Sequence, residues 1–211
     1  MGILDLDLYA PDIPAMLGIA HTKWTHVWTL ARTGVPRARE SPVERDGLFV
    51  ASTGFVLGDD QPMGFEGSTL ELLARHLIDE VAWPALDYLV VDLPAGTSGL
   101  QHVLARRLKV SGALLVVTPQ RVAHLDTQKV VRLYQHLRTP VLGAVENMAF
   151  LRCPHCSEEV ELFPPAEQTQ TIWEMGVERL ARLAFGPIDS QRAIFDGFAD
   201  RIVEKLGAAS G

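Results

Sequence analysis

Short runs of consecutive apolar residues alternate along the chain with segments in which apolar residues recur every three or four positions. Apolar runs without alternating polar residues are typical of strands buried on both faces of a parallel sheet. Three clear runs and three shorter ones are predicted as strands: Tyr88–Asp92, Ala113–Val117 and Val141–Val145, then Ile3–Leu4, Leu48–Val50 and Leu183–Phe185. The pattern therefore predicts a mostly parallel sheet.

Helical periodicity occupies much of the chain between these runs. The clearest segment begins at Ser68, a favourable N-cap residue, with Glu71 placed for a capping box. The mixed stretch between Ala20 and Asp46 is predicted to be a long loop with a helical piece. Strands alternating with crossover helices predict a doubly wound α/β fold, one domain over residues 1–211 with helices on both faces of its sheet. Four helices are predicted: Ser68–Val81, Ser98–Leu108, Ala123–Leu137 and Ser190–Leu206.

Composition narrows the classes of protein. The 211 residues are 47% hydrophobic and carry a net charge of −7, which favours a folded domain and argues against sequence-independent nucleic-acid binding. We expect no membrane span, because no apolar run approaches about 20 residues. The start of the chain, Met1–Asp5, lacks the basic residues of a signal peptide. Only two cysteines occur, so the chain is not a secreted disulfide framework and we expect a cytoplasmic protein.

Ligands of such sheets bind at the carboxyl ends of the strands. Asp92 closes an apolar strand there and resembles a Walker B carboxylate, which holds the Mg²⁺ of a nucleotide through water. Gly96 follows closely and would let a backbone N–H approach a γ-phosphate. The residues alone support equally well an aspartate that caps the next helix, so both interpretations stay open.

Two further carboxylates, Asp5 and Asp7, follow the first predicted strand. One of the two side chains could face a nucleotide site while the other makes hydrogen bonds within a loop. A carboxylate at this place could orient the water that attacks a phosphate. By themselves the two residues fit better with an acidic turn before Pro11.

The third feature is Cys153-Pro154-His155-Cys156. Two thiolates at this spacing supply half of a tetrahedral sulfur site for Zn²⁺ or an iron–sulfur cluster. Two copies of the chain around a two-fold axis would supply four thiolates. A thiol–disulfide oxidoreductase is a second interpretation, although we expect the acidic residues after the motif to raise rather than lower a thiol pKa. Two incidental loop cysteines are the third.

The chain contains no G-x-x-x-x-G-K-[ST] motif, so it lacks the usual phosphate-binding loop of nucleotide hydrolases. We therefore expect this chain by itself to hydrolyse ATP poorly or not at all, because the loop's lysine and amides neutralise the charge that develops on the phosphoryl group.

Several ordered segments together resemble the Mrp family of iron–sulfur cluster carriers, relatives of the MinD and ParA ATPases with deviant P-loops. The resemblance runs from Gly2 to Phe163 and more loosely through Gly186–Asp189. An Asn-Met pair followed closely by the cysteine motif is its most specific part. The matching segments are Gly2–Gly18, Asp87–Thr97, Thr118–Gln120, Pro140–Met148 and Cys153–Cys156.

The resemblance implies roles for individual residues. Cys153 and Cys156 would bridge a [4Fe–4S] cluster across a homodimer, within a cluster-binding and dimerisation segment at 150–165. A nucleotide with Mg²⁺ would use Asp92, Asp5 and Gly96, with Asp7 as the catalytic, water-orienting carboxylate. The adenine base would contact Asn147 and the segment around Pro187.

Relative to the family, the first strand, the phosphate-binding loop and the helix that follows it are missing, so we expect the remaining sheet to expose an apolar edge. The chain would then be a fragment, the partner of a chain that supplies the missing half, or a nucleotide-free member. The expected function is an iron–sulfur carrier or scaffold that serves recipient apo-proteins. A non-catalytic pseudo-ATPase that binds a partner, and a positioning ATPase of the MinD/ParA type, are the alternatives.

Overall fold

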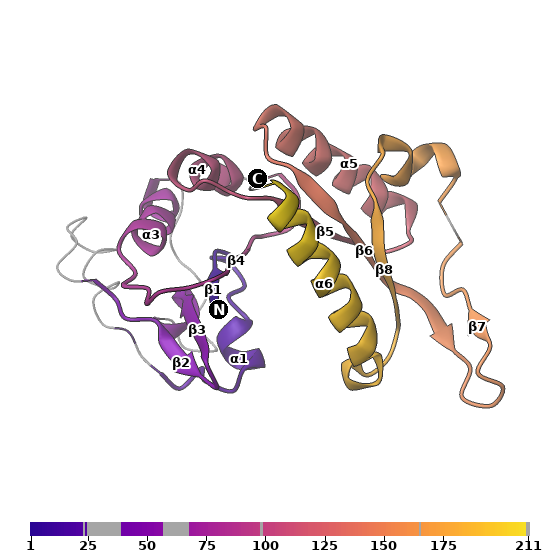
Figure 1. The fold of residues 1–211 in the computed structure, drawn as a ribbon, viewed down its shortest axis with the longest axis horizontal. Coiled ribbons are helices and arrows are strands. Elements are labelled where there is room, and N and C mark those ends of the chain that lie inside the picture. The colour runs from indigo at the N-terminus through magenta and orange to yellow at the C-terminus, as the bar shows by residue number, and fades with distance from the viewer. Residues whose placement is uncertain (23, 25–38, 57–67, 98, 165, 210–211) are drawn as a thin grey trace. The chain divides into compact units, whose positions relative to one another are not determined.

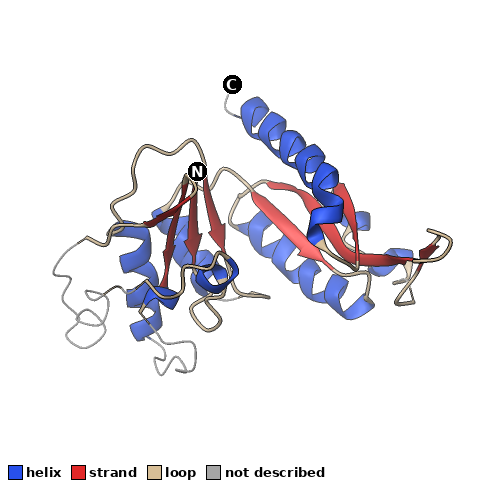
Figure 2. Ribbon diagram, turned by 90° about the horizontal axis from the view of Figure 1, so that it is seen from below, coloured by secondary structure: helices blue, strands red, loops and turns tan. Residues whose placement is uncertain are grey.

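The computed structural model describes residues 1–22, 24, 39–56, 68–97, 99–164 and 166–209 (Figure 1). The chain forms two compact units, Met1–Lys109 and Val110–Gly211, and each is described by itself. Each unit contains a mostly parallel sheet with helices packed against it (Figure 2). This arrangement confirms the predicted α/β fold class, while the assignment of residues 1–211 to one domain stays a prediction.

The sheet of the first unit has the strand order β2-β3-β1-β4. β1 is parallel to both of its neighbours, β3 and β4, and β2 is antiparallel to β3. Because the parallel strands share a direction, their carboxyl ends lie at one edge. The bounds are β1 (Gly2–Asp5), β2 (Val43–Arg45), β3 (Leu48–Ser52) and β4 (Leu89–Asp92).

The strand β2 was not predicted. It falls at the end of the stretch between Ala20 and Asp46 that we expected to be a loop, and much of that stretch lies outside the described residues. Asp46 and Gly47 join β2 to β3 with φ angles of 51° and 79°. Two consecutive left-handed residues match the twist of a two-residue hairpin, which explains the antiparallel edge strand.

The helices of the first unit follow the predicted periodicity. In α3 the apolar stripe turns inward, with Leu73 and Leu77 buried, and α3 packs against α4. The predicted first residue of α4, Ser98, lies outside the described residues. The helices are α1 (Ile13–Met16), the short 3-10 helix η1 (Thr53–Phe55), α3 (Ser68–Asp79) and α4 (Gly99–Arg107).

In the second unit, β6 lies between β5 and β8 and is parallel to both. The two-residue strand β7 lies within Ser157–Phe163, whose alternating pattern is typical of an extended strand, and pairs antiparallel with the far end of β6. β8 begins earlier than predicted and ends before Phe185. The bounds are β5 (Ala113–Val117), β6 (Val141–Arg152), β7 (Glu159–Val160) and β8 (Arg179–Ala184).

The strand β6 is much longer than the predicted Val141–Val145. It continues past the polar pair Glu146 and Asn147 because the backbone adjusts there: Met148 has a φ of 54°, and the register with β8 shifts between Glu146 and Phe150. An irregularity of this kind re-aims side chains while the strand continues. Because β6 keeps its direction past this irregularity and ends at Arg152, Cys153 follows the strand directly.

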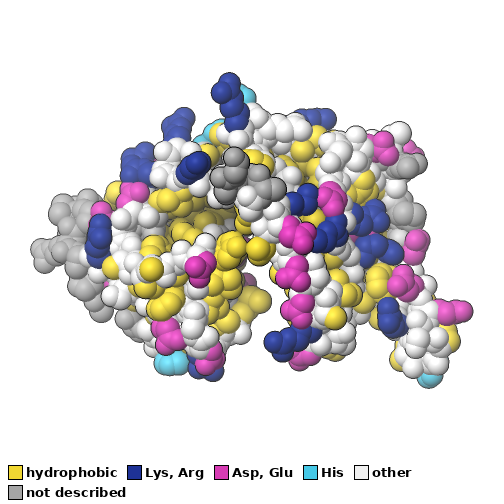
Figure 3. All heavy atoms as spheres, viewed as in Figure 1, with side chains coloured by type: hydrophobic (Ala, Val, Ile, Leu, Met, Phe, Trp, Pro, Cys, Tyr) yellow, Lys and Arg dark blue, Asp and Glu magenta, His cyan; other side chains and the backbone are white. Residues whose placement is uncertain are grey.

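Two long helices, α5 (Arg121–His136) and α6 (Arg192–Ala209), lie on opposite faces of the second sheet (Figure 2). α5 covers the side of β5 from which Leu115 and Val117 point, and its own Val131 is buried in the same cluster. Acidic side chains line the outward face of α6 (Figure 3): Asp196, Asp200 and Glu204. The 3-10 helices are η2 (Gln168–Gln170), η3 (Trp173–Met175) and η4 (Ile188–Gln191).

The prediction that the apolar strands are buried on both faces is wrong for β4 and β5. Leu114 and Val116 of β5 are 40% and 63% exposed, and Val90 of β4 is 50% exposed. Both strands lie at the end of their sheets among the described strands, and only one face of β5 is covered by α5. None of the helices in the described ranges combines the length and apolar content needed to cross a bilayer.

Candidate functional site

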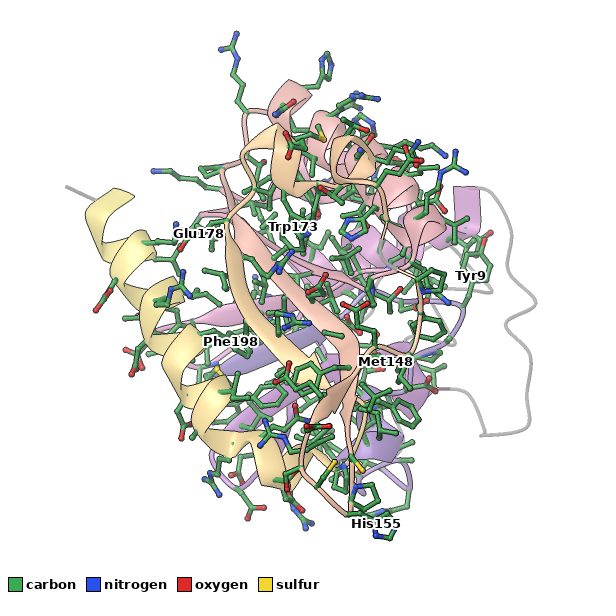
Figure 4. All side chains as sticks on the ribbon, turned by 90° about the vertical axis from the view of Figure 1, so that its right-hand side faces the viewer. Tyr9, Met148, His155, Trp173, Glu178 and Phe198 are labelled. Carbon is green, nitrogen blue, oxygen red and sulfur yellow. The ribbon has the colours of Figure 1, made fainter. Side chains whose placement is uncertain are left out.

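The cysteine motif forms a tight turn between β6 and β7. The backbone N–H of Cys153 donates to the carbonyl of Glu158 over 2.9 Å, and the N–H of Ser157 donates to the carbonyl of Cys153 over 2.9 Å. Ser157 has a left-handed φ of 63°, which reverses the chain so that β7 can return along β6. His155 lies at the tip of this hairpin (Figure 4). We call Cys153–Ser157 the cysteine turn.

The backbone of the cysteine turn favours a thiolate. Hydrogen bonds from the backbone N–H groups of Cys156 and His155, and from the Cys156 side chain, lower the pKa of the Cys153 thiol. The Cys156 thiol lies 3.6 Å from a carboxylate oxygen of Glu158. The expectation that the acidic residues raise a thiol pKa is therefore wrong for Cys153, because the amides of the turn point at its sulfur.

Both cysteines are free thiols, Cys153 partly and Cys156 largely exposed. Thiolates are the form that binds metals, and exposure allows ligands from outside the chain to complete a site. Over the described residues, no group of three or more His, Cys, Asp and Glu side chains could hold a metal ion. The cysteine turn thus fits half of a four-sulfur site, and the other ligands would have to come from elsewhere.

In the first unit, the carboxyl ends of three parallel strands bring polar side chains together. Asp5 of β1 is the direct cross-strand neighbour of Ser52 in β3 and of Asp92 in β4. Asp5 is fully buried, and one of its carboxylate oxygens accepts the Ser52 hydroxyl over 2.8 Å. We call Asp5, Ser52 and Asp92 the carboxylate edge.

The acids of the carboxylate edge resist ionisation. Burial raises the pKa of Asp5 from 3.8 to about 6, the negative charge of Asp92 adds to this increase, and the hydrogen bond from Ser52 opposes it. Asp92 lies at the exposed end of β4, where partial desolvation by the neighbouring strands raises its pKa and the charge of Asp7 contributes in the same direction. Carboxylates that raise one another's pKa are stabilised in their charged form by a cation, and oxygen ligands suit Mg²⁺.

Asp7 lies in the loop after β1, where its carboxylate accepts the N–H of Ala10 over 3.2 Å. Its own N–H donates to Asp5 over 3.1 Å, so both predicted aspartates make local hydrogen bonds. Gly96, in the loop after β4, has a φ of 78°, a conformation that favours glycine, and its carbonyl accepts the side-chain amide of Gln101. Asp5, Asp7 and Asp92 lie close enough in the first unit for their charges to act on one another, although over the described residues they do not form a group of three that could hold a metal ion by itself.

The two residues predicted to contact adenine belong to the second unit, as do the cysteines. Asn147 lies at the irregular point of β6, and its side-chain oxygen accepts the N–H of Met148 over 2.9 Å. Pro187 is exposed in the segment between β8 and η4, and its carbonyl accepts the Ser190 hydroxyl over 2.7 Å. The left-handed Met148 is a strained position, and such positions are often found at functional sites.

Two residues that take part in these sites were not identified from the sequence. Ser52 holds the buried carboxylate of Asp5, and the rule that ligands meet at strand ends could have identified it, because it closes β3. Glu158 accepts the N–H of Cys153 through its backbone carbonyl. No sequence signal indicates that contact, because any residue has a carbonyl.

Curated relatives cover most of this chain. An iron-sulfur cluster carrier protein of Pseudomonas fragi is 36% identical over 187 residues, which are 87% of this chain and 61% of that protein. The iron-sulfur cluster carrier protein of Escherichia coli K12 is 36% identical over 163 residues, 77% of this chain and 42% of that protein. The iron-sulfur cluster transfer protein NUBPL of Dictyostelium discoideum is 31% identical over 85% of this chain and 54% of its own. The chain spans about half the length of the curated relatives it matches.

Solved structures show the same fold. A nucleotide-binding protein of Archaeoglobus fulgidus in complex with ADP superposes with a TM-score of 0.66 at 28% identity, covering 96% of this chain and 74% of that one. The septum site-determining protein MinD of Pyrococcus horikoshii, complexed with Mg-ADP, has a TM-score of 0.56 at 17% identity over 97% of this chain and 75% of its own. The second likeness concerns the fold alone.

A family model agrees with these likenesses. Residues 1–196 match the ParA model, described as NUBPL iron-transfer P-loop NTPase. The match covers both units, including the carboxylate edge and the cysteine turn. The chain therefore belongs to the ParA family of NUBPL iron-transfer P-loop NTPases.

Proposed function

We propose that this protein carries an iron–sulfur cluster on Cys153 and Cys156 and delivers it to recipient apo-proteins in the cytoplasm. The single observation that carries the proposal is the cysteine turn, whose amides stabilise a thiolate on an exposed loop. Relatives that are named iron-sulfur cluster carrier proteins support the same cargo.

The proposed cluster is [4Fe–4S], bridged between two copies of the chain. Each cysteine turn offers two sulfur ligands, and a two-fold axis through the cluster places the same two residues on the opposite side. Four thiolates complete the ligand set of a [4Fe–4S] cluster, and equally that of Zn²⁺. The position of the cysteine turn supports this assembly, because His155 lies at the margin of the molecule (Figure 4) and both thiols are accessible from outside the chain.

The carboxylate edge supports a second site, for a nucleotide with Mg²⁺. Asp5 and Asp92 would attract the cation, Asp7 would orient water, and Gly96 would lie near the phosphates. The contacts of Asn147 and Pro187 with the base stay a prediction from the family resemblance, because both residues belong to the second unit. The sequence contains no G-x-x-x-x-G-K-[ST] loop, so this site would need a phosphate-binding loop from another polypeptide segment, for which a partner chain is one source.

The test is anaerobic reconstitution with iron and sulfide, followed by measurement of bound iron, labile sulfide and oligomeric state. We expect about four iron atoms per dimer. The matched control is the double variant Cys153→Ala/Cys156→Ala, which should lose the cluster and keep the fold, because both side chains lie at the surface.

Either of two results would overturn the assignment. Iron and sulfide that remain bound in the double variant would exclude the cysteine turn as the ligand. A wild-type protein that takes up Zn²⁺ but never iron with sulfide would make the four-thiolate site a zinc site, and the chain would then be better explained as a scaffold that binds partners.

A further inference from the structure

The hairpin that bears the cysteine turn has few connections to the sheet. β6 pairs with β5 only as far as Glu146 and with β8 only as far as Phe150. Beyond Phe150, β6 pairs with β7 alone, through Leu151↔Val160 and Arg152↔Glu159. Backbone pairing therefore leaves the hairpin free to swing about Phe150.

One side chain of the sheet spans this gap. Arg182 of β8 lies with its Nη1 3.5 Å from the carboxylate of Glu159 in β7. Its Nε donates to the carboxylate of Glu146 over 3.2 Å. The guanidinium also lies over the ring of Phe150, 5.2 Å from the centroid. Arg182 thus contacts β7, the body of β6 and the residue about which the hairpin would swing.

Glu146, which Arg182 contacts on the body of β6, is held firmly in place. The side chain of Glu146 is only 8% exposed, and it pairs with Arg179 at 3.6 Å as well as with Arg182. A buried carboxylate held by two guanidinium groups is a fixed point rather than a mobile surface charge. Of the described β8 residues, Arg182 alone forms an ion pair with β7.

We propose that Arg182 is a positioning residue for the cluster: it fixes the direction of the hairpin, so that the two thiolates of the cysteine turn meet those of a second copy. This inference rests on the proposed function. A site shared between two chains requires ligand directions that are set before assembly, because a loosely held arm presents its sulfurs in many orientations.

The experiment compares Arg182→Met with Arg179→Met. Methionine keeps the apolar stem in each case. Arg179 belongs to the same strand and pairs with the same Glu146 but has no ion pair with β7 among the described residues, so it is the matched control. Arg182→Lys retains the charge and serves as the conservative rescue. Three quantities are measured: amide exchange of Phe185 in metal-free protein, the rate of iron loss to a chelator from reconstituted protein, and the visible circular dichroism of the cluster. The N–H of Phe185 donates to the carbonyl of Phe150 over 2.7 Å, at the point about which the hairpin would swing.

We expect Arg182→Met to accelerate exchange of the Phe185 amide by about fivefold to twentyfold, the size of one ion pair with one cation–π contact, because the bond from Phe185 to Phe150 opens when the hairpin swings. Iron loss should accelerate and the circular dichroism should change, with Arg182→Lys close to the wild type and Arg179→Met unchanged. Equal exchange in Arg182→Met and Arg179→Met would overturn the proposal. So would faster exchange with unchanged iron loss and spectrum, which would make Arg182 merely structural. If the wild type binds no cluster, the proposed function fails on its own, while the exchange data still decide whether Arg182 holds the hairpin.

Discussion

The cysteine turn and the carboxylate edge hold their reactive groups in opposite ways. The cysteine turn is contained in five consecutive residues at the surface, and its own backbone amides support the charged form of Cys153. The carboxylate edge needs three strands that are distant in sequence, and burial disfavours the charged form of Asp5. One site is local and exposed; the other is assembled from three strands around the buried Asp5 and Ser52.

This difference predicts that the carboxylate edge affects the stability of the fold, whereas the cysteine turn affects the binding of a metal. The cysteine turn lowers the pKa of the Cys153 thiol without burying the thiolate charge. A thiolate is therefore available to bind a metal without lowering the stability of the fold. The carboxylate edge places Asp5 where ionisation opposes folding, because its folded pKa of about 6 lies above the unfolded value of 3.8. Substitutions at the carboxylate edge should therefore alter stability, whereas those at the cysteine turn should alter binding alone.

The largest expected effect on stability is that of Asp5→Asn. Between pH 4 and 7 the folded wild type binds more protons than the unfolded chain, so its free energy of unfolding should decrease as pH rises through about 6. A shift of this size corresponds to about 3 kcal/mol. The isosteric amide cannot ionise, so the variant should gain that amount relative to the wild type across this window, measured by urea unfolding at several pH values.

The exposed Asp46→Asn is the control for this comparison, because Asp46 also follows a strand and makes only an exposed ion pair. It gives the effect on stability of removing a carboxylate at an exposed strand end. If the difference in stability between Asp5→Asn and the wild type did not change with pH, Asp5 would ionise as freely in the folded state as in the unfolded chain, and the contrast between the two sites would disappear.

A smaller effect is expected for Ser52→Ala. The buried hydroxyl donates to Asp5 over 2.8 Å and accepts the N–H of Gly54 over 3.0 Å, so its loss should lower the free energy of unfolding by about 1–2 kcal/mol. It should also raise the pKa of Asp5 further, measured by NMR titration of its carboxyl carbon. Ser190→Ala, which removes an exposed hydrogen bond to Pro187, should change stability by less than about 0.5 kcal/mol. Similar losses in the two variants would contradict a special role for the buried edge.

The sequence predicted most of the fold because the apolar runs are strong local signals. Ala113–Val117 was predicted with its observed bounds. The prediction ended β6 at Val145 because Glu146 and Asn147 are polar, yet the strand continues: Glu146 is paired with two arginines from β8, a contact that only the folded sheet creates. The one-sided exposure of β4 and β5 likewise depends on which element covers each face, and local hydrophobicity does not contain that information.

The two sites likewise differ in how much of each can be predicted from local sequence. The cysteines were recognisable because two thiols three positions apart carry their chemistry in their spacing. The acid at Asp5 was identified, but its burial and its partner Ser52 arise from the register of β1 and β3, residues separated by more than forty positions in the chain. The direction of the Cys153 pKa was predicted wrongly because the sign was taken from the charged side chains, whereas the closest groups are amides of the backbone.

That backbone origin leads to the smallest predicted effect, a change in reactivity with no change in stability. In metal-free protein the pH midpoint for alkylation of Cys153 by iodoacetamide, followed by site-resolved mass spectrometry, should lie below 9.0. At neutral pH Cys153 should react a fewfold faster than an unperturbed cysteine, since the greater thiolate fraction outweighs the lower nucleophilicity of a more acidic thiol. His155→Ala keeps the amide that donates to the sulfur and should leave this midpoint unchanged. A midpoint that moves up in His155→Ala would assign the effect to the imidazole side chain and not to the backbone. The cysteine turn would then depend on a particular side chain, as the carboxylate edge depends on Ser52, and the distinction between a locally encoded site and an assembled one would no longer hold.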